Sequence, residues 1–171
     1  MTSLSTPGQT IGPFFRFGLD VDRGNQLVPV GSVGAIRLVG TVRDGANEPV
    51  PDALVELWQT DAAGAIPAAT GSLQRDRSTF TGWGRCHTTE LGEFEFITVE
   101  PGASFFAVAV FARGLMDVLH TRIYLPGTSD PFLDGLAPER RETLLAERVS
   151  GGLRRDIRLQ GEHETVFLDY R

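Results

Sequence analysis

The sequence predicts an all-β protein: an antiparallel β-sandwich with an extended N-terminal arm and one late helix. Three observations favour this fold class. Residues 93–99 alternate strictly between polar and apolar side chains, which is the period of a strand with one buried face. Residues 105–111 form a continuous apolar run, typical of a strand buried on both faces. Frequent Gly and Pro turns separate several further short strands, as expected in a sandwich.

Residues 1–34 are expected to form an arm and a loop, and residues 35–171 the sandwich domain. Within the first part, residues 6–19 contain two Pro, three Gly and three Phe and show neither helical nor strand periodicity. A segment this apolar does not remain solvated. It should therefore lie along another surface, either its own domain or a partner subunit. Packing on a partner is the prediction adopted for the arm.

Residues 38–64 predict a hairpin around which the rest of the chain is organised. Strands are expected on both sides of the Asp44-Gly45 turn, since Gly accepts a positive φ without steric cost. Two such strands need a larger sheet to cover them. Further strands are predicted at residues 119–125, 156–159 and 165–168. The late helix is predicted at residues 138–149, where the apolar side chains can share one stripe.

Composition bounds the classes of function. At 171 residues the chain is expected to form one domain, and its net charge of −6 argues against a general affinity for nucleic acid. No apolar run approaches the roughly 20 residues needed to span a bilayer, so no membrane partner is expected. The single cysteine, Cys86, excludes an internal disulfide framework. Together with the lack of a signal-peptide pattern, it favours a cytoplasmic location.

Residue types that carry catalysis or bind metals are few and scattered. His87, His120 and His163 are not spaced at i, i+2 or i, i+4, so a metal site built by this chain alone is not expected. No nucleophile elbow, P-loop or dinucleotide fingerprint occurs. An independent metalloenzyme that uses these histidines is the least favoured alternative.

Arg113 is the charge that most needs an explanation. It follows the apolar run at residues 105–111, where an arginine must find an anionic or hydrogen-bonding partner. A structural ion pair, with Asp117 or Glu56, is one interpretation. Binding of a carboxylate ligand is the other, and the residues alone do not decide between the two.

Several segments resemble, in the right order, the intradiol ring-cleavage dioxygenase family, and within it the α-type chains. The similarity covers nearly the whole sequence, and the combination of motifs is highly specific. The segments are TPGQTIGPFF (6–15), VELWQTDAAG (55–64), VEPG (99–102), VFARG (110–114), TRIYLPG (121–127), ERRETLLAERV (139–149) and DIRLQGEHETVFLDY (156–170).

The resemblance implies a β-sandwich of the intradiol dioxygenase type and a hetero-oligomer of αβ protomers. In this family a catalytic β subunit binds Fe(III) through two Tyr and two His. The enzyme adds both atoms of O₂ to 3,4-dihydroxybenzoate and forms 3-carboxy-cis,cis-muconate. The α-type chain is non-catalytic: it supports assembly and completes the substrate pocket at the interface.

The same resemblance implies that this chain has lost the iron ligands. Ile66 stands where a catalytic chain carries one Tyr, and Phe105 and Ala107 stand where it carries two His. The second Tyr should lie in the segment before the strand at residues 105–111, which is shortened here to residues 101–104 and contains no Tyr. Because Fe(III) needs phenolates and imidazoles, no metal ligand or catalytic residue is assigned to this chain. Fe(III) is expected in the partner β subunit.

Four residues are carried over by motif as substrate-binding candidates: Thr10, Gly12 and Pro13 of the arm, and Arg113. Gly and Pro allow a close backbone approach, and a guanidinium would attract the substrate carboxylate. The resemblance thus favours the ligand interpretation of Arg113. The short segment 101–104 would alter the pocket rim. The alternative of a different class is a stand-alone β-sandwich binding module without enzymatic activity, which has little use for an apolar arm.

Overall fold

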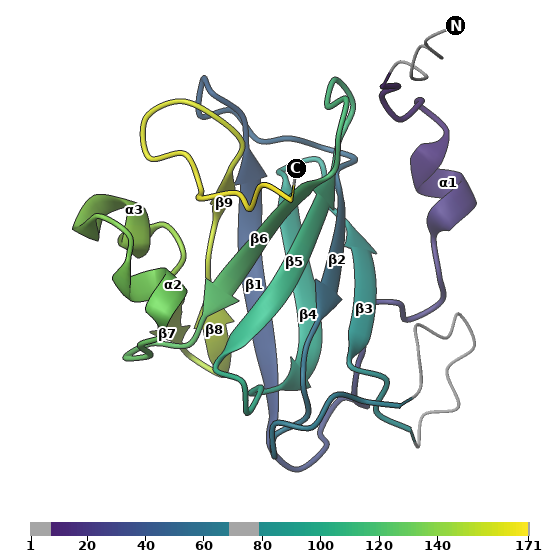
Figure 1. Ribbon diagram of the computed structural model, residues 1–171. Coiled ribbons are helices and arrows are strands. Elements are labelled where there is room, and N and C mark those ends of the chain that lie inside the picture. Colours follow the sequence, from purple (N-terminus) through teal and green to yellow (C-terminus); the bar gives the residue numbers. More distant parts are fainter. Residues whose placement is uncertain (1–7, 69–78, 171) are drawn as a thin grey trace, which may run out of the picture.

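The computed structural model describes residues 8–68 and 79–170, and this part of the chain forms two β-sheets packed face to face (Figure 1). The first sheet has the order β4–β1–β8–β7, with β9 added to β1, and the second has the order β3–β2–β5–β6. The first sheet consists of β1 (Ala35–Arg43), β4 (Glu93–Val99), β7 (Glu147–Val149), β8 (Gly152–Arg154) and β9 (Ile157–Arg158). The second consists of β2 (Leu54–Trp58), β3 (Trp83–His87), β5 (Phe105–Phe111) and β6 (Leu119–Tyr124).

The predicted antiparallel β-sandwich is confirmed, with one local exception. β8 and β9 run parallel to β1, because the C-terminal segment returns along the edge of β1 that β4 leaves open. The remaining strand pairs are antiparallel. The predicted strand at 156–159 is found, shortened to β9. The segment 165–168 forms only an isolated bridge, between Leu168 and His120.

The core lies between the two sheets. Its largest side chains are Phe96 and Leu38 from the first sheet and Phe106 and Leu57 from the second, all of them fully buried. At about 25 cal/mol per Å² of apolar surface removed from water, these side chains are the main source of stability. On β5 the inward residues are buried, whereas Phe105 and Ala107 on the outer face are only half-buried. The expectation that both faces of β5 are fully buried was therefore wrong.

The predicted hairpin at residues 38–64 is replaced by a crossover between the sheets. β1 and β2 do not pair, since β1 belongs to the first sheet and β2 to the second. Only a short local hairpin forms around Asp44-Gly45, with Val50 N–H donating to Val42 O. Pro49 and Pro51 supply no ladder donors. Asp52, with φ of 62°, then turns the chain toward the second sheet.

The predicted helix at 138–149 is correct only for its first turn. Helix α3 spans Pro138–Glu142, and Glu147–Val149 form β7 instead. Between them, Leu144 O accepts from Tyr124 N–H and Ala146 N–H donates to Tyr124 O. Leu144 is thereby buried in a second apolar cluster with Tyr124 and Leu133. Tertiary burial thus outweighs the helical stripe read from the sequence.

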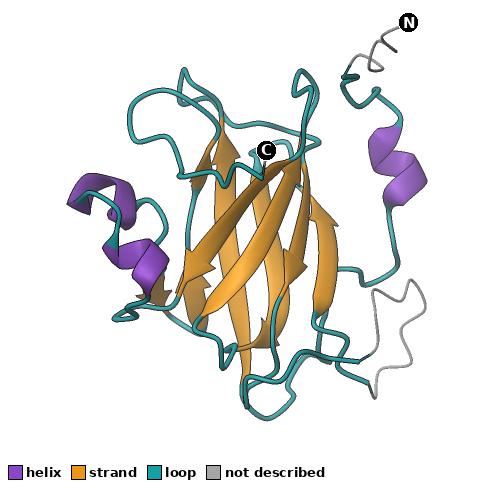
Figure 2. Cartoon of the chain, in the orientation of Figure 1, coloured by secondary structure: helices purple, strands orange, loops and turns teal. Residues whose placement is uncertain are grey.

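Two further short helices were not predicted. α1 (Phe15–Leu19) lies in the N-terminal arm and α2 (Pro131–Asp134) precedes α3. Figure 2 shows the strands in the middle of the molecule, with α1 on one side and α2 and α3 on the other. Among the described residues, no helix is long and apolar enough to cross a membrane.

Candidate functional site

The N-terminal arm reaches the loop that follows β5. Thr10 Oγ1 accepts a hydrogen bond of 2.7 Å from the backbone N–H of Gly114. Arg113, the residue before Gly114, is exposed, and 54% of its side-chain surface is accessible. Two of the predicted binding residues, Thr10 and Arg113, are therefore brought together although 103 positions separate them in the sequence.

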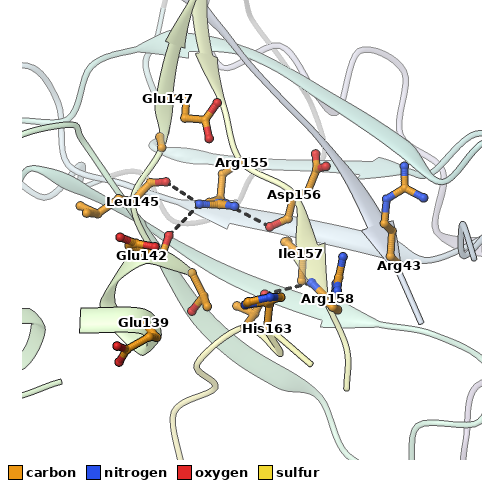
Figure 3. A pocket seen from close by; sticks show the side chains of 13 residues that line it. Arg43, Glu139, Glu142, Leu145, Glu147, Arg155, Asp156, Ile157, Arg158 and His163 are labelled. Atoms are coloured by element: carbon orange, nitrogen blue, oxygen red, sulfur yellow. Dashed lines mark hydrogen bonds between the residues drawn. The ribbon is translucent and has the colours of Figure 1, made fainter. Parts of the chain in front are cut away.

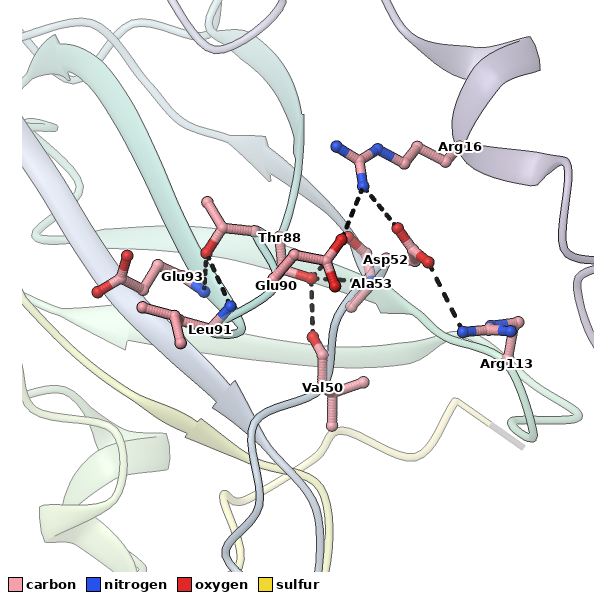
Figure 4. Close-up of polar contacts among 10 residues, drawn as sticks. Arg16, Val50, Asp52, Ala53, Thr88, Glu90, Leu91, Glu93 and Arg113 are labelled. Atoms are coloured by element: carbon pink, nitrogen blue, oxygen red, sulfur yellow. Dashed lines mark hydrogen bonds and ion pairs between the residues drawn. The ribbon is translucent and has the colours of Figure 1, made fainter.

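Asp52 connects this loop to the arm (Figure 4). Its Oδ2 lies 3.6 Å from Arg113 Nη2, and its Oδ1 accepts a hydrogen bond of 2.7 Å from Arg16 Nη1. The ion pair of Arg113 thus forms with a carboxylate that the sequence did not single out. Nothing in the sequence around Asp52 indicated a cationic partner.

Gly12 and Pro13 stand just before α1, and both are exposed. Gly12 O accepts from Phe15 N–H at the start of this helix. A Cβ added at Gly12 would meet no atom within 4 Å, so space within this chain does not require glycine there. The role of both residues in substrate binding stays a prediction.

A half-buried ion pair holds the other end of the arm. Arg85 Nε on β3 donates to Glu56 Oε1 on β2 over 2.9 Å, and Arg85 Nη1 donates to Leu19 O over 3.3 Å. The Arg85 guanidinium lies 5.1 Å from the centroid of the Trp83 ring. Because about 15% of each charged side chain is exposed, this pair is better shielded from solvent than the Arg113–Asp52 pair. Glu56, which the sequence offered as a partner for Arg113, is engaged here instead.

Residues at the expected iron-ligand positions lie around one pocket. Ile66, Phe105 and Ala107 line a cavity of about 270 Å³, together with Ala103 from the short loop before β5. These side chains offer no oxygen, nitrogen or sulfur atom to a metal. Their convergence agrees with the motif alignment, and their chemistry does not fit Fe(III), which binds phenolate and imidazole ligands.

This pocket and the Arg113 loop lie at opposite ends of β5. The strand begins at Phe105, beside the pocket, and its last residue, Phe111, is about 20 Å away at 3.3 Å per residue. Within residues 8–68 and 79–170, no group of three or more His, Cys, Asp or Glu side chains could hold a metal ion. The predicted substrate-binding residues are therefore not part of the pocket that contains Ile66.

Cys86 and His87, neighbours on β3, face different surroundings. Burial raises the pKa of the Cys86 thiol to about 12, which suits a thiol packed against the core. Burial also lowers the pKa of His87, whose ring lies edge-on to Phe15 of α1 with centroids 6.5 Å apart. Neither ring nitrogen of His87 has a hydrogen-bond partner among the described residues. These positions agree with structural roles.

A larger, polar pocket of about 430 Å³ lies beside β9 and α3 (Figure 3). Its cationic groups are tied internally: Arg155 Nη1 donates to Glu142 O and Leu145 O over 2.7 and 2.8 Å, and Arg158 Nη1 donates to Glu162 O over 2.8 Å. Its lining carries charges of both signs. None of the predicted substrate-binding residues lies there, so it is not the candidate site.

Comparisons with known proteins agree with this architecture. A family model described as Dioxygenase matches residues 12–147. The chain is 36% identical to the protocatechuate 3,4-dioxygenase alpha chain of Pseudomonas putida, with 96% of each chain covered. It is 30% identical to the protocatechuate 3,4-dioxygenase beta chain of Burkholderia cepacia, over 75% of this chain and 63% of that one.

Among solved structures, the chain is similar to the dioxygenase domain of a dioxygenase and carbohydrate-binding protein fusion from Streptomyces sp. SirexAA-E. The TM-score is 0.56 and the identity 27%, with 90% of this chain and 95% of the other covered. The fold is thus a dioxygenase-type β-sandwich, and the described lining of the pocket at the start of β5 contains no Tyr, His, Cys, Asp or Glu side chain. The chain belongs to the intradiol ring-cleavage dioxygenase family.

Proposed function

We propose that this chain is the non-catalytic α subunit of a protocatechuate 3,4-dioxygenase. It assembles with a catalytic β subunit and completes the pocket in which 3,4-dihydroxybenzoate is cleaved with O₂ to 3-carboxy-cis,cis-muconate. The single observation that carries the proposal is the apolar lining at the expected ligand positions, Ile66, Phe105 and Ala107. The full-length similarity to a protocatechuate 3,4-dioxygenase alpha chain supports it.

Fe(III) is held by the partner β subunit in this proposal. Iron supplies the site that brings O₂ and the aromatic substrate together, and no residue described in this chain offers the donor set it requires. The contribution of this chain is to bind and orient. Its candidate groups are the exposed guanidinium of Arg113 and the arm around Thr10, Gly12 and Pro13, with the substrate at the interface between the two subunits.

Arg113 suits recognition of a carboxylate. Its guanidinium presents a planar fork of N–H donors, and Asp52 engages one side of it at 3.6 Å. With 54% of its surface exposed, this side chain is accessible to a ligand. A carboxylate on the aromatic ring would then be bound by a cation that is already oriented. The hydrogen bond from Gly114 N–H to Thr10 Oγ1 keeps the arm beside this group.

The alternative is a stand-alone binding module that kept the fold and lost the chemistry. The N-terminal arm argues against a stand-alone module, because Phe14 and Phe17 expose 79% and 77% of their surface. Apolar side chains in such a position are typical of a surface that another molecule covers.

Expression of the full chain alone and together with a β chain that supplies two Tyr and two His tests the proposal. The isolated chain should contain no stoichiometric iron and show no ring cleavage, and the pair should co-purify and oxidise 3,4-dihydroxybenzoate. Stoichiometric ferric iron with a purple-red phenolate absorption in the isolated chain would contradict the proposal. An active β chain that never associates with this chain would favour the binding module.

A further inference from the structure

The pocket at the start of β5 has the properties of a binding site in its own right. It measures about 270 Å³, and its lining side chains come from β2, β5 and the two loops beside them. We infer that this pocket binds a small, uncharged, apolar aromatic molecule, such as an alkyl- or halogen-substituted benzene. This inference does not depend on the proposed function, because it concerns a pocket about one strand length away from Arg113.

The hollow results from a small residue placed beside a large one. Ala107 on β5 lies directly opposite Trp58 on β2, so both side chains are on the same outer face of the sheet. The methyl group of Ala107 leaves open the space above it, between the Trp58 and Phe105 rings that also line the pocket. The Trp58 ring packs against the Trp83 ring, with ring centroids 6.0 Å apart. The cavity therefore has aromatic walls and a small-residue floor.

The surrounding loops are held by close backbone contacts that only glycine permits. A Cβ on Gly82, whose φ is 66°, would lie 2.5 Å from Gln59 O and 2.6 Å from the Pro67 ring. A Cβ on Gly102 would lie 2.3 Å from Gly64 N, and Gly102 N–H donates to Asp61 O over 2.8 Å. Because these contacts fix both walls, the pocket is preformed, as ligand pockets usually are.

The polar groups of the lining are mostly committed to the protein. Gln59 donates to Thr60 O and Val99 O, both over 3.0 Å, and accepts from Thr98 Oγ1. Thr60 Oγ1 accepts from Ala103 N–H, and Thr81 Oγ1 donates to Trp83 O. Apart from the indole of Trp58, the lining side chains in the described part of the chain therefore have little hydrogen-bonding capacity left for a ligand.

Charge also selects the ligand. None of the described lining residues is charged. Arg122, opposite Ala107 on β6, directs its guanidinium over the Phe105 ring at 4.5 Å and donates to Tyr124 Oη over 2.9 Å. Asp130, 3.6 Å away, balances this cation. Because Arg122 is already paired and the described lining carries no charge, an anionic ligand would lose its hydration without an equivalent partner, so carboxylates should be disfavoured. Hydroxylated rings should also be disfavoured, because the described polar groups of the lining are already engaged in hydrogen bonds.

Size and exposed apolar surface agree with an aromatic ring. A dry apolar cavity of about 150 Å³ is enough to bind benzene, so this pocket has room for a substituted ring. Ile66 at its rim exposes 86% of its surface, and Trp58 exposes 40%. Covering these side chains would remove apolar surface from water, which is favourable by about 25 cal/mol per Å².

Titration of the full-length chain with toluene tests the inference, followed by tryptophan emission and by saturation transfer from protein to ligand in NMR spectra. Toluene should bind saturably and more tightly than catechol, and benzoate should bind most weakly. The variant Ala107→Leu should fill the hollow and weaken toluene binding by about tenfold or more. The matched control Ala46→Leu, at an exposed turn outside the pocket, should bind toluene like the unchanged chain.

Three outcomes would overturn the inference: no saturable binding of toluene, equal binding by the Ala107→Leu variant, or preference for benzoate. The titration is repeated with the assembled α and β chains. Binding retained there supports a small-molecule site. Binding lost there contradicts it, because a side chain of the partner would then occupy the pocket. None of these results depends on ring-cleavage activity, so failure here leaves the proposed function untouched.

Discussion

Asp52 Oδ1 accepts a hydrogen bond of 2.7 Å from Arg16 Nη1, and this contact joins the N-terminal arm to the turn that precedes β2 (Figure 4). The other carboxylate oxygen of Asp52 lies 3.6 Å from Arg113 Nη2. One carboxylate therefore orients both the arm helix and the arginine proposed to bind substrate. A substitution of Asp52 should therefore affect both the position of α1 and the orientation of Arg113.

The substitution Asp52→Asn should loosen the arm with little effect on the fold. Because all three charged side chains are partly exposed, the free energy of unfolding should fall by less than about 1 kcal/mol. Amide hydrogen exchange in residues 15–19 should become clearly faster. The control Glu100→Gln removes another exposed ion-pair carboxylate, the partner of Arg148, and should leave exchange in the arm unchanged. Unchanged protection in the Asp52→Asn variant would show that the other contacts of the arm hold it without the Arg16–Asp52 ion pair.

The Glu56–Arg85 pair should matter more for stability than the exposed pairs. The substitution Glu56→Gln keeps the shape of the side chain but leaves the Arg85 guanidinium without its counter-charge, so the free energy of unfolding should fall by about 1 to 3 kcal/mol. Urea denaturation measures this. Glu95→Gln makes the same change in the exposed pair with Arg37 and should cost less than about 1 kcal/mol. Equal costs for the two variants would contradict the stabilising role of burial.

His87 should make the stability of the chain depend on pH. Burial lowers its pKa in the folded state below the ordinary value of 6.5, so the unfolded chain binds a proton more readily. The neutral ring therefore stabilises the fold fully above pH 6.5, and this contribution is lost as the pH falls from 6.5 through the folded-state pKa. Asp20 and Asp52 favour the protonated ring, whereas Arg16 and Arg85 oppose it.

The substitution His87→Phe removes this titration and should flatten the loss of stability between pH 7 and about 5. Denaturation midpoints in urea at several pH values measure the difference between the two proteins. At the low end of this pH range the variant should be at least as stable as the unchanged chain, because it no longer buries ring nitrogens that lack a hydrogen-bond partner among the described residues. Parallel curves for the two proteins would show that His87 does not titrate in this range.

Local pattern was enough to predict the sandwich but not the path of the chain between its sheets. The alternation at residues 93–99 and the apolar run at 105–111 gave β4 and β5 directly, because burial of one face enforces the period of two. The prediction of a hairpin at 38–64 was wrong because two strands joined by a turn can either pair with each other or belong to different sheets. Which of these occurs depends on β3 and β4, which lie far along the sequence and pair with β2 and β1.

Residues of the candidate site could be predicted only where they fall within a motif that resembles the family. The resemblance placed Ile66, Phe105 and Ala107 together, and the structure gathers them around one pocket. Asp52 could not be found in this way, because its two arginines come from positions 16 and 113 and no spacing rule links them. The prediction of a helix over 138–149 was largely wrong for a related reason. Tyr124, which is distant in the sequence, forms backbone hydrogen bonds with Leu144 and Ala146 that replace those of a helix.

Arg113 should set the preference for carboxylated substrates. In the assembled enzyme, Arg113→Ala should raise KM for 3,4-dihydroxybenzoate by about tenfold or more and change KM for catechol, which lacks the carboxylate, much less. The KM of the Arg113→Lys variant for 3,4-dihydroxybenzoate should lie between those of the unchanged enzyme and the Arg113→Ala variant, since lysine keeps the charge and loses the fork of donors. Arg37→Ala, which removes an exposed arginine from the other sheet, is the matched control and should change neither constant. If Arg113→Ala raised both KM values equally, the guanidinium would be holding Asp52 and the arm in place rather than binding substrate.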